Sequence, residues 1–117
     1  MKILLADGRT EVRHALKILL GQQTGLDVVD ETGELGNLVV KTGEWGPDLL
    51  LLDWELSSLK VSDIIPVLRH LQPGIRIIAL SVRPEASGPA LSAGADAFVS
   101  KGENPEKLLE AINKVFK

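Results

Sequence analysis

The sequence predicts a single doubly wound α/β domain built around a parallel five-stranded sheet. Short apolar runs alternate with amphipathic stretches along the whole chain, five of each, which is typical of successive βα units. One of these runs, Leu49–Asp53, is four leucines ending in an aspartate, so this strand is apolar on both faces, as in a sheet covered by helices on both sides. A chain of 117 residues suits one such domain.

Composition excludes several classes of function. The chain has no cysteine, which rules out disulfides, thiolate zinc sites and cysteine nucleophiles. Its net charge is −3 with both signs interspersed, so it offers no basic surface for nucleic acid and no polybasic patch for a membrane. The apolar runs are too short to span a membrane, and a cytoplasmic protein is expected. Solvated helix faces are expected for His14 and His70 rather than a metal site.

The first half of the chain predicts three strands separated by two helices. The strands are expected at Lys2–Ala6, at 26–31 and at Leu49–Asp53. Thr10 is expected to cap the first helix, and a weaker second helix is expected over 35–45, where glycines interrupt the pattern. Apolar residues at helical spacing support these two helices: Val12, Leu16, Leu19, Leu20, Leu35, Leu38 and Val39.

A polar loop over 57–60 precedes the third helix. Ser62 is expected to cap this helix, and Pro66 is expected near its first turn, where a missing N–H group costs least. The apolar face of the helix consists of Ile64, Ile65, Leu68 and Leu71. The break at Pro73-Gly74 then separates the helix from a fourth strand over 75–80.

The last part of the chain predicts two helices around a fifth strand. The fourth helix is expected within 83–93, short or late-starting because Gly88-Pro89 falls inside the pattern. The fifth strand is expected over 95–100. Asn104 is expected to cap the final helix, with Pro105 in its first position. The apolar face of that helix consists of Leu108, Leu109, Ile112, Val115 and Phe116.

The carboxyl ends of four predicted strands carry polar side chains. The common order for five parallel strands is 2-1-3-4-5, although the sequence leaves other orders open. In that order, the residues that follow or end strands 1, 3, 4 and 5 line one edge of the sheet: Asp7, Asp53, Ser81 and Lys101. Strand 2 is then an edge strand, and its last residues, Asp30 and Glu31, are expected to face solvent.

These four side chains together suit the handling of a phosphoryl group. Two carboxylates can hold a hard cation such as Mg²⁺, and the carboxylate of Asp53 can attack phosphorus to form an acyl phosphate. Lys101 can pair with the carboxylate at rest and with the phosphate afterwards, and Ser81 can donate a hydrogen bond to a phosphate oxygen. The competing interpretations are that Asp53 only caps the next helix and that Lys101 is an ordinary surface lysine.

Four segments carry a resemblance to a known family, in order and at the right spacing. They are residues 3–7 (ILLAD), 47–53 (PDLLLLD), 93–101 (AGADAFVSK) and 105–112 (PEKLLEAI). In these segments the chain resembles the response-regulator receiver domain of two-component signalling, across essentially its whole length. The last segment resembles the final helix of receivers that precede helix-turn-helix output domains.

The resemblance implies a flavodoxin-like (βα)5 fold and a phosphorelay function. Asp53 would accept a phosphoryl group from a partner histidine kinase, and Lys101 matches the lysine characteristic of the family. Mg²⁺ would be held by Asp7, Asp53 and the backbone carbonyl of Glu55. Ser81 would move toward the phosphate and Phe98 would turn inward, with a plain core role as the competing interpretation of Phe98.

The resemblance also implies partners for a single receiver domain over residues 1–117. Phosphorylation would change the surface formed by the fourth helix, fifth strand and fifth helix, through which a homodimer is possible. The output, such as transcription, would be regulated by protein contacts, and DNA would be reached only through an output domain outside this chain. No membrane partner is expected. The chain is expected not to be an enzyme, since decay of its own acyl phosphate is not catalysis on a free substrate.

The main departure from the family pattern is Gly8, which stands where a second acidic residue is usual. One fewer carboxylate near the cation predicts weak Mg²⁺ binding. The side chain of Glu55 is one candidate to supply the missing carboxylate, and the guanidinium of Arg9 is a candidate to fill the acidic pocket in place of metal. Milder departures stand at Ser57, Ser81 and Gly102.

Two alternatives to a phospho-accepting receiver stay open from the sequence. The first is a degenerate receiver that acts as a phosphorylation-independent interaction module, which Gly8 motivates. The second is a phosphatase resembling haloacid dehalogenases, suggested only by Asp53-Trp54-Glu55. That family places its nucleophile on its first motif strand and needs later acidic metal ligands, and this chain has neither, so the phosphatase is disfavoured.

Overall fold

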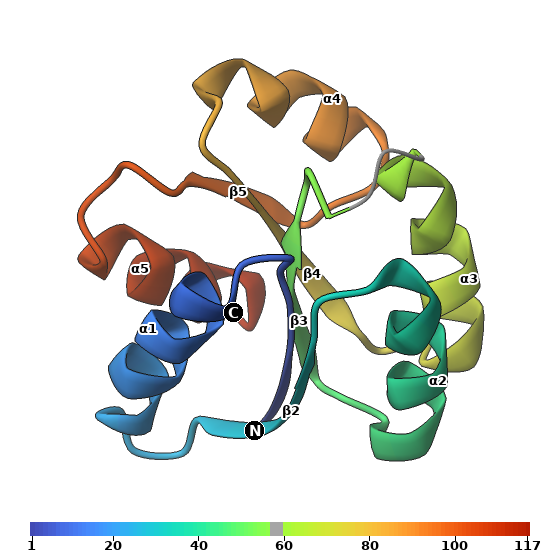
Figure 1. Cartoon of the computed structure of the whole chain (residues 1–117), viewed down its shortest axis with the longest axis horizontal. Coiled ribbons are helices and arrows are strands. Elements are labelled where there is room, and N and C mark those ends of the chain that lie inside the picture. Colours follow the sequence, from blue (N-terminus) through green and yellow to red (C-terminus); the bar gives the residue numbers. More distant parts are fainter. Residues whose placement is uncertain (57–59) are drawn as a thin grey trace.

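A computed structural model describes residues 1–56 and 60–117 and confirms the predicted fold (Figure 1). Five parallel strands form one sheet in the order β2-β1-β3-β4-β5. The strands are β1 (Lys2–Ala6), β2 (Asp27–Thr32), β3 (Leu49–Asp53), β4 (Arg76–Ser81) and β5 (Ala97–Ser100). The α-helices are α1 (Thr10–Gly21), α2 (Leu35–Trp45), α3 (Ile65–Leu71), α4 (Ser87–Ser92) and α5 (Glu106–Val115). Of the polar loop predicted over 57–60, residues 57–59 lie outside the described residues.

The sheet separates two apolar layers, and β3 lies at its centre. Leu50 and Leu52 pack on the face covered by α2, α3 and α4, whereas Leu49 and Leu51 pack on the face covered by α1 and α5. Figure 1 shows α1 and α5 together on one side of the sheet and α2 and α3 on the other. Every residue of β3 is buried, which confirms that this strand is covered on both faces.

Two helix caps predicted from hydroxyl residues are wrong. Arg9, with extended dihedrals, precedes α1, and Thr10 is already the first helical residue. The Thr10 hydroxyl instead accepts a hydrogen bond from Nη2 of Arg13 at 3.3 Å. Ser62 lies inside a short 3-10 turn, η1 (Val61–Ile64), that leads into α3. A hydroxyl predicts a cap only if the preceding loop turns into the helix at that residue, and loop direction is not encoded in the hydroxyl itself.

The predicted start of the last helix is confirmed. Asn104 Oδ1 accepts a hydrogen bond from the backbone N–H of Glu106 at 3.0 Å, and Pro105 has helical dihedrals. The fourth helix is short and late, as predicted: a 3-10 turn, η2 (Pro84–Ala86), precedes the six residues of α4. Pro66 lies in the first turn of α3, and His14 and His70 are exposed, also as predicted.

Strand β5 begins two residues later than predicted. Gly94 has a φ of +109°, which ends the chain reversal after α4, and the backbone N–H of Ala95 is bonded to the carbonyl of Ala90. Ala95 therefore closes the helix rather than joining the sheet. Strands β2 and β4 are each shifted by one residue from the predicted bounds. Within residues 1–56 and 60–117, no helix has both the length and the apolar character needed to cross a membrane.

The end of the edge strand β2 does not face solvent freely, contrary to the prediction. Asp30 lies 2.6 Å from Nζ of Lys41, and Glu31 pairs with Nε of Arg13 at 2.8 Å and with Lys17. Both carboxylates are half-buried under these side chains from α1 and α2. The hydrogen bonds from the cations hold the pKa of both carboxyl groups below the ordinary range.

Candidate functional site

The candidate site lies at the carboxyl edge of the sheet, where four strands end. Asp7 follows β1 directly, Asp53 is the last residue of β3, Ser81 ends β4, and Lys101 follows β5. The backbone N–H of Lys101 is bonded to the carbonyl of Ser81 at 2.8 Å, which continues the strand pairing into the site. Each polar residue comes after an apolar run whose burial fixes the strand, so its position is set by the core.

Asp7, Asp53 and Lys101 form a buried ion cluster. The Nζ of Lys101 lies 2.6 Å from Oδ2 of Asp7 and 3.2 Å from Oδ1 of Asp53. Asp7 is 1% exposed and Asp53 is 4% exposed. Two carboxylates this close and this buried repel each other, and the shared ammonium offsets that repulsion. Sequence reasoning correctly placed all three in one group.

Backbone N–H groups also contact both carboxylates. Oδ1 of Asp53 accepts a hydrogen bond from the N–H of Glu55 at 3.0 Å, and Oδ2 lies 3.5 Å from the N–H of Gly8. Oδ1 of Asp7 accepts a hydrogen bond from the N–H of Arg9 at 2.9 Å. These bonds compensate both carboxylates for the water lost on burial. In Asp7 the backbone bond is made by Oδ1 and leaves Oδ2 for Lys101, whereas Oδ1 of Asp53 contacts both the backbone and Lys101.

Ser81 belongs to a second polar cluster beside the first. Its fully buried Oγ lies 2.8 and 2.9 Å from the two carboxylate oxygens of Glu55, and it accepts a hydrogen bond from the backbone N–H of Arg83 at 3.0 Å. Nη2 of Arg83 lies 3.6 Å from the same carboxylate. The side chain of Glu55 is therefore directed at Ser81 rather than completing a carboxylate set with Asp7 and Asp53.

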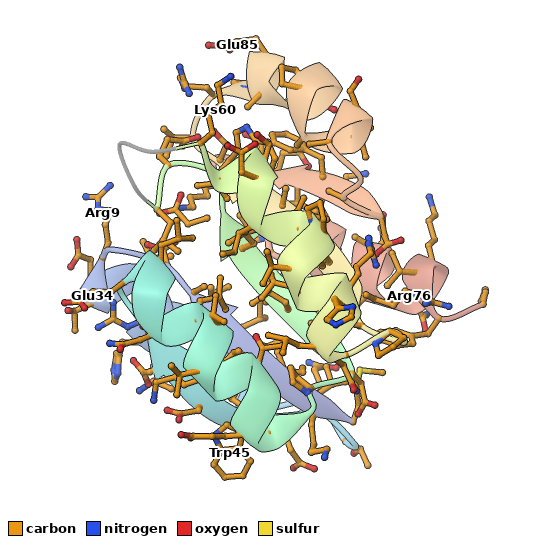
Figure 2. The ribbon with its side chains drawn as sticks, turned by 90° about the vertical axis from the view of Figure 1, so that its right-hand side faces the viewer. Arg9, Glu34, Trp45, Lys60, Arg76 and Glu85 are labelled. Atoms are coloured by element: carbon orange, nitrogen blue, oxygen red, sulfur yellow. The ribbon has the colours of Figure 1, made fainter. Side chains whose placement is uncertain are left out.

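The two candidates to replace the missing acid at Gly8 behave differently from the sequence hypotheses. Arg9 projects into solvent, as Figure 2 shows, with its side chain 63% exposed and its Nε bonded to Glu11, so it does not fill the acidic pocket. Glu55 is occupied by Ser81. A Cβ placed on Gly8 would meet no atom within 4 Å, which leaves this position open in space.

Phe98 lies in β5 and is half-buried. It packs against the apolar layer that contains Ala90 of α4 and Ile65 of α3. Its place in the strand pairs it with Ala79 of β4, two residues before Ser81. Because the Phe98 ring is only half-buried, its position is compatible both with a fixed place in the core and with a ring that turns inward.

Sequence reasoning did not find Arg13, which supports the acidic cluster from behind. Its Nη1 donates a hydrogen bond to the backbone carbonyl of Asp7 at 2.6 Å, and its Nε pairs with Glu31 of β2. The side chain thereby connects the loop after β1 to the edge strand. An arginine on an amphipathic helix gives no sign of such a contact in the sequence, because the contact depends on where β2 ends.

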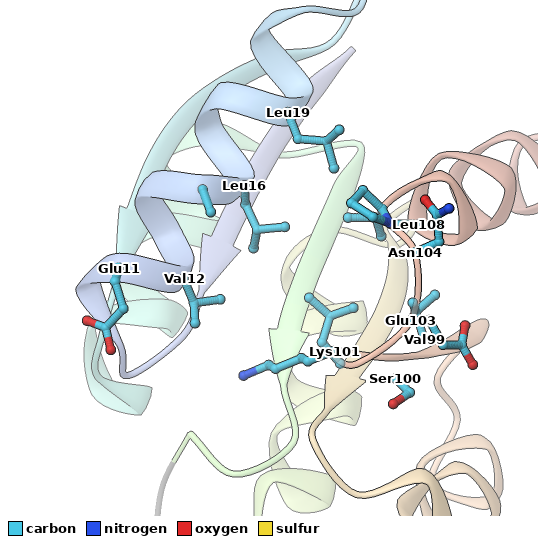
Figure 3. A pocket seen from close by; sticks show the side chains of 13 residues that line it. Glu11, Val12, Leu16, Leu19, Val99, Ser100, Lys101, Glu103, Asn104 and Leu108 are labelled. Atoms are coloured by element: carbon cyan, nitrogen blue, oxygen red, sulfur yellow. The ribbon is translucent and has the colours of Figure 1, made fainter.

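An apolar groove of about 350 Å³ opens beside Lys101, between α1 and the start of α5. Figure 3 shows side chains of both helices facing each other across it, with Lys101 along one end. The residues that line it include Val12, Leu16, Leu19, Val99 and Leu108. The groove lies next to the carboxylate cluster and does not contain Asp7 or Asp53.

Comparison with known proteins identifies the family. The model of the response regulator receiver domain matches residues 3–113. The chain is 28% identical to Fimbriae Z protein of Salmonella typhimurium over 97% of its length, and 28% identical to chemotaxis protein CheY of Thermotoga maritima over 99% of its length. It covers 98% of CheY but 55% of Fimbriae Z protein, and it spans about half the length of the other first relatives it matches.

Solved structures agree with this assignment. The crystal structure of a LuxR-family two-component response regulator from Aurantimonas is similar with a TM-score of 0.88 and 25% identity, over 97% of this chain and 83% of that one. The family match runs from β1 into α5 and so includes every strand whose end builds the site. The chain therefore belongs to the receiver domains of two-component response regulators, as its sequence resemblance predicted.

Proposed function

We propose that this receiver accepts a phosphoryl group on Asp53 from the phosphohistidine of a sensor histidine kinase and thereby switches a protein-binding surface that regulates an output such as transcription. The observation that supports this most directly is the placement of Asp53. Its carboxylate lies at the end of a fully buried strand, 3.2 Å from Nζ of Lys101, at the edge where ligands enter doubly wound domains.

In the proposed reaction, a carboxylate oxygen of Asp53 attacks phosphorus, a P–O bond forms, and the P–N bond to the kinase imidazole breaks. The departing imidazole nitrogen takes a proton from solvent and leaves as a neutral ring. The backbone N–H of Glu55 keeps the attacking carboxylate oriented. Lys101, released from part of its pairing, neutralises a phosphoryl oxygen after the transfer.

Mg²⁺ is the cation that this chemistry implies, and the donor set fits it only in part. The oxygens that would hold it are the carboxylates of Asp7 and Asp53 and the backbone carbonyl of Glu55. When bound, Mg²⁺ would neutralise charge on the phosphoryl oxygens. In the described part of the chain, no three histidine or acidic side chains are grouped as a metal site. Gly8 supplies no third carboxylate and the Glu55 carboxylate is bonded to Ser81, so weak Mg²⁺ binding is part of the proposal.

Ser81 and Phe98 are the proposed switch residues. Ser81 would move its hydroxyl from Glu55 to a phosphoryl oxygen, and Phe98 would turn inward into the space that this movement opens. The short helix α4 suits an element that shifts, because its six residues and the preceding 3-10 turn bury few apolar side chains, among them Ala86 and Ala90.

Intact mass spectrometry after incubation with Mg²⁺ and acetyl phosphate tests the proposal. The wild-type chain is expected to gain the mass of one phosphoryl group, and Asp53→Ala is expected to gain none. No gain in the wild type at high Mg²⁺ concentration contradicts phosphorylation of Asp53. A gain in both proteins contradicts the assignment of the acceptor.

The second candidate is a degenerate receiver that binds partners without phosphorylation. The observation that favours it is the position of Lys101, whose ammonium already bridges Asp7 and Asp53 where a cation is expected. In that case Asp53→Ala would bind the partner kinase or output protein as tightly as the wild type. Loss of partner binding in Asp53→Ala, together with a phosphoryl mass gain in the wild type, decides for the first candidate.

A homodimer through α4, β5 and α5 is the proposed consequence of switching. A shallow groove of about 510 Å³ lies between β5 and α5 and is lined by both Lys107 and Lys114 and by Glu110, so it carries charges of both signs. Such a surface suits a second copy of itself. Sedimentation of the wild type with and without beryllofluoride measures this, with no change in mass contradicting it. The proposal assigns any contact with DNA to an output domain and not to this receiver.

A further inference from the structure

The hydroxyl of Ser81 is already hydrogen-bonded within the protein, without a phosphoryl group on Asp53. Ser81 is fully buried, and its Oγ lies 2.8 Å and 2.9 Å from the two oxygens of the Glu55 carboxylate. A serine hydroxyl has one proton to donate, and here that proton goes to Glu55. The same oxygen accepts a hydrogen bond from the backbone N–H of Arg83 at 3.0 Å. Ser81 therefore has no proton for an anion on Asp53 while Glu55 stays in place.

Glu55 is held in this position by Ser81 more than by its ionic partner. Nη2 of Arg83 lies 3.6 Å from Oε2 of Glu55, and the Arg83 side chain is 59% exposed, so this pair contributes little. A hydrogen bond from a buried hydroxyl to a carboxylate is stronger. The backbone N–H of Glu55 is bonded to Asp53, and that bond does not depend on the side chain at position 55.

We propose that the Glu55 carboxylate is a built-in competitor for a tetrahedral anion at Asp53. It takes the Ser81 proton that a phosphoryl oxygen needs, and its negative charge opposes a second anion beside it. This inference rests on the proposed phosphoryl-accepting function and adds that Glu55, as a positioning residue, controls when Ser81 is free. Since 32% of the Glu55 side chain is already exposed, it can rotate into solvent without crossing the core.

The test measures binding of beryllofluoride in the presence of Mg²⁺, followed through the amide NMR signals of Ser81 and Lys101. Glu55→Ala is expected to lower the half-saturating concentration about tenfold, because a charged competitor for one hydrogen bond is removed. Glu55→Gln keeps a neutral acceptor and is expected to fall between Glu55→Ala and the wild type. The matched control is Glu85→Ala, which removes an exposed acid from η2, away from the Ser81 contact, and is expected to equal the wild type.

A double variant separates competition from charge repulsion. In a Ser81→Ala background the contested proton is absent, so Glu55→Ala is expected to give a clearly smaller gain in affinity, which measures the charge repulsion alone. The proposal is overturned by an equal gain in that background, by an equal gain for Glu85→Ala, or by no gain for Glu55→Ala when Ser81 is present. Absence of saturable binding in both the wild type and Glu55→Ala also overturns it.

Intact mass after acetyl phosphate treatment keeps this proposal distinct from the proposed function. A phosphoryl mass gain in the wild type without tighter beryllofluoride binding in Glu55→Ala contradicts the competitor role of Glu55 and leaves the proposed phosphorylation of Asp53 standing. A gain in Glu55→Ala but not in the wild type supports the competitor and describes a self-blocked receiver. Tighter anion binding in Glu55→Ala without any mass gain supports the competitor and contradicts the phosphoryl-accepting function.

Discussion

Among single residues, Gly8 is the position at which an added side chain would bring a third carboxylate to the site, and it has the space for one. A side chain there would meet no atom within 4 Å, and its backbone N–H already faces Asp53 at 3.5 Å. Gly8→Asp is therefore expected to raise Mg²⁺ affinity about tenfold or more, since a third carboxylate near the cation is worth up to a few kcal/mol. Isothermal titration calorimetry measures this.

Gly36 offers the matched control for this substitution. It is exposed in α2, and a side chain there also meets nothing within 4 Å. Gly36→Asp adds the same charge at a distance from the site and is expected to leave Mg²⁺ affinity unchanged. Equal affinity for Gly8→Asp and the wild type would mean that Asp7, Asp53 and the carbonyl of Glu55 are not the metal ligands.

Lys101 is the residue whose loss is expected to destabilise the fold most within the site. Lys101→Ala leaves Asp7 and Asp53 buried side by side without a cation, which is expected to cost about 3 kcal/mol of unfolding free energy. Lys107→Ala, whose pair with Glu110 is 57% exposed on both sides, is expected to be nearly neutral. Urea unfolding at neutral pH measures both, and similar values for the two variants would contradict the role of Lys101.

The acidic cluster was predictable from sequence at this scale, whereas the bonding of Ser81 was not. Asp7, Asp53 and Lys101 each follow an apolar run, so burial of the strand fixes where the charge lies. The pairing of Ser81 with Glu55 depends on the path of the chain after β3, which brings a solvent-accessible side chain back over β4. Hydrophobic periodicity holds no information about that path.

Among elements, strands and helices were predictable and their junctions were not. The buried strand β3 and the amphipathic helix α5 follow directly from apolar patterns. The prediction that Thr10 and Ser62 cap helices was wrong, because α1 and η1 each begin at an earlier residue than the predicted cap implies. The prediction that Asp30 and Glu31 face solvent was wrong, because long basic side chains from α1 and α2 pack over the end of the edge strand and pair with both carboxylates.

These edge contacts predict acid sensitivity. The hydrogen bonds from Lys17 and Arg13 lower the pKa of Glu31 from its ordinary value of 4.5. Its ionised form is thus favoured by the fold, so its contribution to stability is present above pH 4.5 and is lost as the pH falls through the lowered pKa. When the pH is lowered from 6 to about 3, the unfolding free energy of Glu31→Gln is expected to fall less than that of the wild type, because the variant has no carboxylate at position 31 to protonate.

Urea unfolding at several pH values measures this difference. The matched control is Glu44→Gln, which makes the same change on the exposed surface of α2 and is expected to follow the wild-type profile. If Glu31→Gln and the wild type lose stability in parallel, the contacts across α1 and β2 do not contribute to acid sensitivity.

For the whole molecule, the two apolar layers explain why the fold class was predictable. A strand that is apolar on both faces requires cover on both sides, and the alternation of strands and helices supplies it. Leu51 is 1% exposed in the layer beneath α1 and α5. Leu51→Ala is expected to lower the unfolding free energy by about 2–5 kcal/mol.

Ile18→Ala is the comparison for this prediction. Ile18 is 53% exposed on α1, and its truncation is expected to change stability by less than about 0.5 kcal/mol. Urea unfolding of both variants decides the point. A small loss for Leu51→Ala would mean that the central layer relaxes around the missing side chain.

The bond between Lys101 and Asp7 joins residues 94 positions apart in the chain. The site is therefore assembled from the first and last strands, and it exists only after the whole domain has been synthesised and has closed. An N-terminal piece of the chain that ends between β3 and β5 contains Asp53 but lacks the Lys101 ammonium that lies beside it. The phosphoryl-accepting reaction proposed for Asp53 therefore requires a chain that contains both Asp7 and Lys101.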